Sequence, residues 1–229
     1  MTPDEALDAL RAAADPARKP GMARVGITVD RALGVPVPSI RAIARRAGTD
    51  HELARALWAT GIHEARFLAT LVADPTAITE RETDRWARDL DSWDVGDAAA
   101  DLFARTPTRD ATIRAWADDD APYVKRAAFA MIARRAVSDH AASDAAFRRY
   151  LPTIRRAARD DRNEVRKAVS WALRQIGKHN ATLHADAIAT AERILADGER
   201  TGAGGSRWVA RDVLRELRSD AVLRRLALA

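Results

Sequence analysis

Four segments of the chain share a pattern that is typical of stacked helical repeats. They begin at Ile62, Val95, Val124 and Val165, and each starts with a β-branched residue and has alanine three positions later. The starts are 33, 29 and 41 residues apart, which brackets the two-helix period of HEAT-like repeats. A small residue at a fixed position lets neighbouring helices approach closely. The pattern therefore predicts a stack of helix pairs.

Helical periodicity extends through the rest of the chain. Apolar residues recur at spacings of three and four, and alternating runs of strand type are nearly absent. Thr79 to Glu82 has the form of a capping box, and Ser219 and Asp220 are suited to start a short last helix. The glycine-rich segment 201–206 is expected to be a flexible connection between helices.

These signals predict an all-α protein built as a right-handed α-solenoid of HEAT-like repeats. We expect a single domain over residues 1–229. Within it, short N-terminal helices occupy residues 1–50, the repeats occupy about 51–200, and capping helices occupy about 204–229.

Composition excludes several classes of protein. The chain has no cysteine, which excludes disulfide scaffolds, thiol nucleophiles, zinc fingers and iron–sulfur clusters. Its five histidines show no metal-ligand spacing, so neither a metal nor a cofactor is expected. No apolar run reaches the roughly 18 residues that a membrane span needs. Residues 1–16 lack the features of a signal peptide, so we expect a cytoplasmic protein with no membrane partner.

Charge is unevenly distributed along the chain. Residues 1–147 contain 20 Lys and Arg against 23 Asp and Glu, whereas residues 148–229 contain 18 against 10. A basic C-terminal third suggests a face for a polyanion. A solvated basic surface explains the same charge, and the residues alone leave both interpretations open.

The repeat register aligns one polar position in all four segments. The residue two after each start is Glu64, Asp97, Arg126 or Lys167. We expect this ladder to lie on the concave side of the solenoid, where such proteins usually bind their partners. Any solvated helix face carries charged residues, so the ladder by itself does not establish binding.

Three motifs follow one another in a fixed order: Asp91-Ser92-Trp93-Asp94-Val95-Gly96-Asp97, then Val124-Lys125-Arg126-Ala127-Ala128, then Lys167-Ala168-Val169-Ser170-Trp171-Ala172-Leu173-Arg174. In this combination the chain resembles the HEAT-repeat DNA alkylation repair proteins, the AlkD-like DNA glycosylases. The resemblance runs from about Gly21 to beyond Trp171 and so covers most of the chain.

The resemblance implies an enzyme that binds double-stranded DNA on the concave face and excises N3- and N7-alkylated purines without a metal or cofactor. It implies that Trp93 and Trp171 pack around the damaged nucleotide, that Asp97 is the catalytic carboxylate, and that Arg126 holds the DNA backbone. Further DNA-binding cations lie near Arg126 in the repeat scheme and are expected to neutralise phosphates: Lys125, Arg166, Lys167 and Arg174.

The chain departs from the family pattern at two positions. The family has a tryptophan pair where Ser92 and Trp93 stand, and the aromatic residue that follows Met-Ala-Arg is replaced by Val25. Both losses weaken the expected aromatic cleft.

The residue types suit the implied chemistry. An alkylated purine is cationic, so its departure leaves an oxocarbenium-like sugar that a carboxylate such as Asp97 stabilises. Indole faces attract a cationic nucleotide by about 0.5 to 2 kcal/mol each. Acid catalysis on the leaving base is not required.

Other interpretations of the same residues stay open. Asp94 is the better candidate for an N-cap than Asp97. Tryptophan in helical repeats usually belongs to the core, as expected for Trp58, Trp86, Trp116 and Trp208. The protein is expected to be a monomer. The main alternative function is a noncatalytic HEAT-repeat module that binds DNA or a protein. A repeat scaffold indifferent to DNA is a third.

Overall fold

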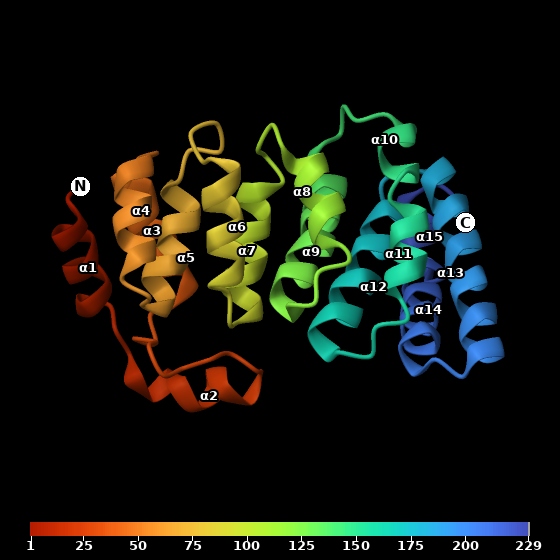
Figure 1. Cartoon of the computed structure of the whole chain (residues 1–229), viewed down its shortest axis with the longest axis horizontal. Helices are drawn as coiled ribbons and strands as arrows, with labels where there is room; N and C mark the ends of the chain where they lie inside the picture. Colours follow the sequence, from red (N-terminus) through yellow and green to blue (C-terminus); the bar gives the residue numbers. More distant parts are fainter. Residues whose placement is uncertain (229) are drawn as a thin grey trace. The chain divides into compact units, whose positions relative to one another are not determined.

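The computed structural model describes residues 1–228 of the chain. Over that range every regular element is a helix and no strand is present (Figure 1). The prediction of an all-α protein is therefore confirmed. The helices cluster into two compact units, Met1–Arg109, here unit 1, and the chain from Asp110 onward, here unit 2. The expectation of a single domain stays a prediction.

Unit 1 is built from helix pairs. Helix α4 packs against α5, α6 packs against α7, and the second helices α5 and α7 pack against each other. Helices α1 and α3 extend this packing toward the N-terminus. The elements of unit 1 are α1 (Pro3–Ala12), the 3-10 helix η1 (Pro16–Arg18), α2 (Lys19–Arg24), α3 (Val37–Ala47), α4 (His51–Ala59), α5 (His63–Val72), α6 (Glu80–Arg88) and α7 (Trp93–Phe103).

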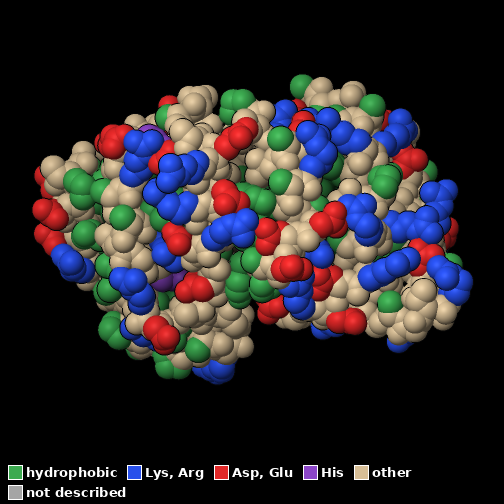
Figure 2. Space-filling view, in the orientation of Figure 1, with side chains coloured by type: hydrophobic (Ala, Val, Ile, Leu, Met, Phe, Trp, Pro, Cys, Tyr) green, Lys and Arg blue, Asp and Glu red, His purple; other side chains and the backbone are tan. Residues whose placement is uncertain are grey.

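Unit 2 has two layers of helices. Helices α9, α12 and α14 pack side by side in one layer, and α10, α11 and α13 form the other. Lys and Arg side chains gather over α11 and α13 on the face seen in Figure 2. The elements are α8 (Arg109–Trp116), which begins at the boundary, α9 (Pro122–Ser138), α10 (Asp144–Arg148), α11 (Leu151–Ala157), α12 (Asn163–Gly177), α13 (Ala181–Thr201), α14 (Gly204–Leu217) and α15 (Asp220–Arg225).

All four repeat starts fall at the N-terminal ends of helices, three of them at the same helical position. Ile62 is the N-cap of α5, and Val95, Val124 and Val165 are each the third residue of α7, α9 and α12. Each repeated alanine follows within the next turn. The pattern in the sequence therefore marks the beginning of the second helices α5, α7, α9 and α12.

Helix ends follow the sequence signals in two places and depart from them in a third. The Thr79–Glu82 capping box opens α6, and Ser219 is the N-cap of α15, as expected. The helix connection expected over 201–206 is present but shorter than expected. Only Gly202 and Ala203 separate α13 from α14, because Gly202 ends α13 with a φ of 75° and α14 begins at once.

The tryptophans expected in the core lie there, with one exception. Trp58 and Trp86 are buried and stack with ring centroids 4.2 Å apart, and Trp116 is buried in unit 2. Stacked pairs of this kind contribute about 1 kcal/mol beyond their buried area. Trp208 is only half-buried, so its assignment to the core is wrong.

Candidate functional site

Trp93 begins α7 and presents its ring to solvent. The side chain is 37% exposed, unusual for a tryptophan in a helical repeat, and its Nε1 donates to the Val25 carbonyl at 3.0 Å. Val25 itself is largely exposed. The indole is therefore fixed by one polar contact while part of its face stays open, which is the arrangement a stacking platform needs.

Ser92 has a structural task that explains its departure from the family pattern. It is completely buried, and its Oγ accepts a hydrogen bond from the Thr28 amide at 2.7 Å. The Thr28 hydroxyl in turn donates to the Asp91 carbonyl at 2.9 Å. These bonds tie the segment that carries Val25 to the start of α7. The two departures noticed in the sequence therefore meet in one place.

Asp97 lies one helical turn after Trp93 on α7. Residues four apart on a helix share a face, so the half-buried carboxylate and the exposed indole are neighbours on the surface of α7. This pair is the part of the predicted catalytic set that unit 1 holds together.

Asp94 does not cap α7, which corrects the sequence interpretation. The N-cap position is Ser92, and Asp94 lies in the first turn with Oδ2 2.9 Å from Nε2 of the buried His63. Burial alone would lower the pKa of His63, but the hydrogen bond and charge of Asp94 outweigh it and raise that pKa. The pair links α5 to α7 beside a cavity of about 140 Å³.

The first rung of the polar ladder is not a surface group. Glu64 is 1% exposed, and its carboxylate accepts hydrogen bonds from the backbone amides of Leu33, Gly34 and Val35 at 2.7 to 3.2 Å. The expectation that Glu64 belongs to a binding face is wrong. It anchors the loop before α3 instead.

Helix α12 carries a stripe of cations around an aromatic ring. Lys167, Trp171 and Arg174 are spaced so that they share one face of the helix, and Lys178 follows as its C-cap. The Arg134 guanidinium from α9 lies 5.1 Å from the centroid of the half-buried Trp171 ring. The Gln175 amide, oriented with its oxygen toward the indole, accepts from Trp171 Nε1 at 3.1 Å. Trp171 is thus held in place as a cation–aromatic platform.

A second platform of the same kind was missed in the sequence. The Arg166 guanidinium from α12 lies 4.9 Å from the ring centroid of Trp208 on α14. Its Nη2 also reaches Asn163 Oδ1 at 3.4 Å. The signal was available, since Arg166 to Trp208, Ser170 to Asp212 and Arg174 to Glu216 all span 42 residues. Helix α14 is a further copy of the repeat whose first position, Arg207, lacks the β-branched residue.

Three predicted phosphate-binding cations are occupied by contacts within unit 2. Arg126 is 7% exposed and its Nη1 donates to the Glu164 carbonyl at 3.0 Å. Lys125 Nζ lies 3.0 Å from Asp160 Oδ2, and Arg162 together with this lysine holds the pKa of Asp160 well below its ordinary value.

Arg174 is the third of these cations. It pairs with Glu216 and Asp212 of α14. Burial raises the pKa of Glu216, but Lys178 and Arg174 outweigh that effect and lower it. Lys167 is exposed and makes no hydrogen bond or ion pair with any residue that the structure describes. Of the predicted cations, Lys167 and the stacked Arg166 are the most available to a ligand.

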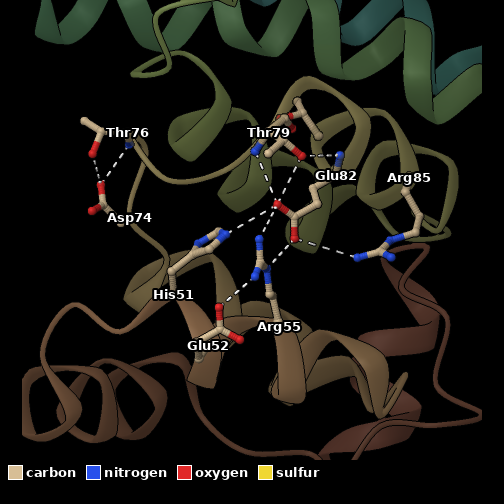
Figure 3. A network of polar contacts seen from close by, with 9 residues as sticks. His51, Glu52, Arg55, Asp74, Thr76, Thr79, Glu82 and Arg85 are labelled. Atoms are coloured by element: carbon tan, nitrogen blue, oxygen red, sulfur yellow. Dashed lines mark hydrogen bonds and ion pairs between the residues drawn. The ribbon is translucent and has the colours of Figure 1, made fainter.

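The most perturbed carboxylate of unit 1 is structural. Glu82 in α6 binds Arg55 of α4 at 2.6 Å and the Thr79 amide at 3.3 Å, and His51 lies 3.6 Å away (Figure 3). The hydrogen bond from Arg55 is the main cause of lowering the pKa of Glu82 to about 2. This network ties two helix pairs together and shares no residue with the Trp93 motif.

Two features are absent from residues 1–228, the range that the structure describes. No group of three His, Asp or Glu side chains is arranged to hold a metal ion in that range. No helix there is long and apolar enough to cross a membrane.

Comparison with known proteins agrees with this architecture. The model of a family described as DNA alkylation repair enzyme matches residues 6–217. The chain therefore belongs to the DNA alkylation repair enzyme family. No curated protein matches the chain.

A solved structure described as "a new family of proteins related to the HEAT-like repeat DNA glycosylases with affinity for branched DNA structures" is similar in fold. Its TM-score is 0.74 at 20% sequence identity, and the match covers 84% of this chain and 83% of that one. The HEAT-like fold expected from the repeat is thereby confirmed.

Proposed function

We propose that the protein is a DNA glycosylase that hydrolyses the N-glycosidic bond of N3- and N7-alkylated purines in duplex DNA. The observation that carries the proposal is the start of α7, where a partly exposed indole and a carboxylate share one helix face, Trp93 and Asp97. Family membership supports it, because the family is one of alkylation repair enzymes.

Asp97 acts on the sugar. An alkylated purine leaves readily because it already carries positive charge, and the sugar becomes oxocarbenium-like as the bond breaks. A carboxylate close to C1′ stabilises that cation and orients the water that attacks it. The water's oxygen bonds to C1′, its proton passes to solvent, and the base leaves as a neutral alkylpurine.

Each unit offers contacts of its own to the DNA. The open indole face of Trp93 attracts the cationic nucleotide. In unit 2 the stripe of Lys167 and Trp171, with Arg134 and Arg166 stacked on tryptophans, offers donors for phosphates and aromatic faces beside them.

A noncatalytic DNA-binding protein is the second candidate. The buried Ser92 favours it, because it fills the position of a family tryptophan with a structural hydrogen bond. The similar solved structure is described as having affinity for branched DNA, which also supports this alternative.

Base release separates the two candidates. We expect the purified protein to release 7-methylguanine and 3-methyladenine from methylated duplex DNA above a blank without protein. Asp97→Asn should abolish release while duplex affinity is kept or improved, because a negative charge is removed.

Asp101→Asn is the matched control. It makes the same change one turn further along α7, at a carboxylate that is 49% exposed and 3.8 Å from Arg105, and it should keep full activity. Salt-sensitive duplex binding without release would establish the binding protein instead.

A further inference from the structure

An arginine-lined groove runs between α11 and α13, in the layer of unit 2 that does not contain the tryptophan platforms. It has a volume of about 620 Å³. One wall comes from the α10–α11 side and the other from α13, and the lining includes five arginines and two aspartates. The charge of the lining is therefore strongly positive. The basic side chains over α11 and α13 are visible in Figure 2.

Ion pairs join the two walls of the groove. Arg148 Nε lies 2.7 Å from Asp186 Oδ2, and Arg155 Nε lies 2.8 Å from Asp197 Oδ2. Each pair connects α13 to the α10–α11 side. Both aspartates are thus engaged by arginines of the opposite wall, and these pairs fix the width of the groove.

Two arginines of the groove remain without an acidic partner. Arg159 and Arg193 are exposed, and neither has a hydrogen bond or ion pair with any residue that the structure describes. Arg156 pairs at 2.8 Å with Asp118, but both side chains are more than half exposed, so water weakens the pair. The groove therefore presents guanidinium groups that are ready for an anion.

We infer that this groove is a second nucleic-acid-binding surface, which takes the phosphate backbone of a DNA segment other than the one held by α9, α12 and α14. Guanidinium groups pair with phosphates through two parallel hydrogen bonds. The side chains lining the groove include none that is aromatic, so it grips the backbone without stacking on bases. The groove has no part in base excision. The inference rests on the proposed function in one respect, which is that the α9, α12 and α14 layer binds DNA.

A bridging assay tests the inference. Two short unmethylated duplexes, one with a donor and one with an acceptor fluorophore, are mixed with the full-length protein at low salt. The wild type should bring both duplexes onto one molecule and give energy transfer. Arg159→Gln with Arg193→Gln should reduce bridging by about tenfold and lower the salt slope of second-duplex binding by about 2.

Arg224→Gln with Arg225→Gln is the matched control. It removes the same charge from exposed arginines of α15 and should bridge like the wild type. The inference is overturned if the wild type binds duplex without bridging, as expected if the groove serves an acidic protein. It is equally overturned if the Arg159 and Arg193 variant bridges fully. Base release is measured separately. A protein that bridges two duplexes without releasing base would contradict the proposed catalysis and support the proposed groove.

Discussion

The start of α7 in unit 1 and the α9–α12–α14 layer in unit 2 differ in the charged groups that surround their tryptophans. In unit 1 an exposed tryptophan stands beside carboxylates, and a buried serine pins the adjoining segment. In unit 2 each half-buried tryptophan lies under an arginine of the neighbouring helix, and most other cations are paired with carboxylates. Under the proposed function, this contrast assigns the carboxylate chemistry to unit 1 and the DNA-binding cations to unit 2.

The largest expected effect comes from restoring the family residue at Ser92. Ser92→Trp inserts an indole where the side chain is fully buried and removes the acceptor of the Thr28 amide. Overpacking of this kind should lower the free energy of unfolding by about 3 kcal/mol. Val25→Tyr at the other departure should cost less than about 0.5 kcal/mol, because Val25 is 60% exposed. Denaturant unfolding of both variants checks this; equal costs would contradict the assigned role of Ser92.

Removing the Glu82 charge should have the next largest effect. Glu82→Gln should cost about 2 kcal/mol of unfolding free energy at neutral pH, because it breaks a charged hydrogen bond with Arg55. A lowered pKa means that the contribution is present above the ordinary value and is lost as pH falls through about 2. The difference between wild type and variant should therefore shrink in acid.

Glu52→Gln is its control. Glu52 binds the same Arg55 at 2.7 Å, but its side chain is 80% exposed, so the change should have little effect at any pH. A cost equal to that of Glu82→Gln would show that burial does not set the difference.

Trp171→Ala tests the proposed binding of duplex DNA by unit 2. Loss of the ring and of its Arg134 contact should weaken duplex binding by about tenfold, with fluorescence anisotropy as the measurement. Trp208→Ala removes the second platform and should act in the same direction. Unchanged affinity in both variants, with folding intact by circular dichroism, would mean that these platforms do not meet DNA.

Apart from the control variants, Asp94→Asn should give the smallest effect, of about 1 kcal/mol in unfolding free energy. The raised pKa of His63 means that the ion pair stabilises the protein most below the ordinary histidine value and is lost as pH rises through the raised one. The cost of the variant should therefore be larger at pH 6 than at pH 9. A cost that grows with pH would contradict a protonated His63 beside Asp94.

The repeat made the fold predictable from the sequence. Which side chains of the candidate site are exposed depends instead on their contact partners, which the repeat does not reveal. Val124 and Val165 mark helix starts because a β-branched residue and a following alanine recur in register. Glu64 has the same repeat position as Asp97, but it is buried because it accepts hydrogen bonds from three backbone amides near Gly34, about 30 residues away. The repeat spacing does not reveal these partners. The assignment of Trp208 to the core overlooks the 42-residue spacing that aligns this residue with Arg166, the arginine that covers it.

The central proposal is that unit 1 carries out base release and that unit 2 supplies DNA affinity. It is tested most directly by measuring base release at saturating protein together with duplex affinity. Two variants are compared: Asp97→Asn in unit 1, and Arg134→Gln with Lys167→Gln in unit 2. We predict that Asp97→Asn loses release and keeps affinity, whereas the unit 2 variant loses affinity far more than release. Full release by Asp97→Asn, or parallel losses in both variants, would contradict the account.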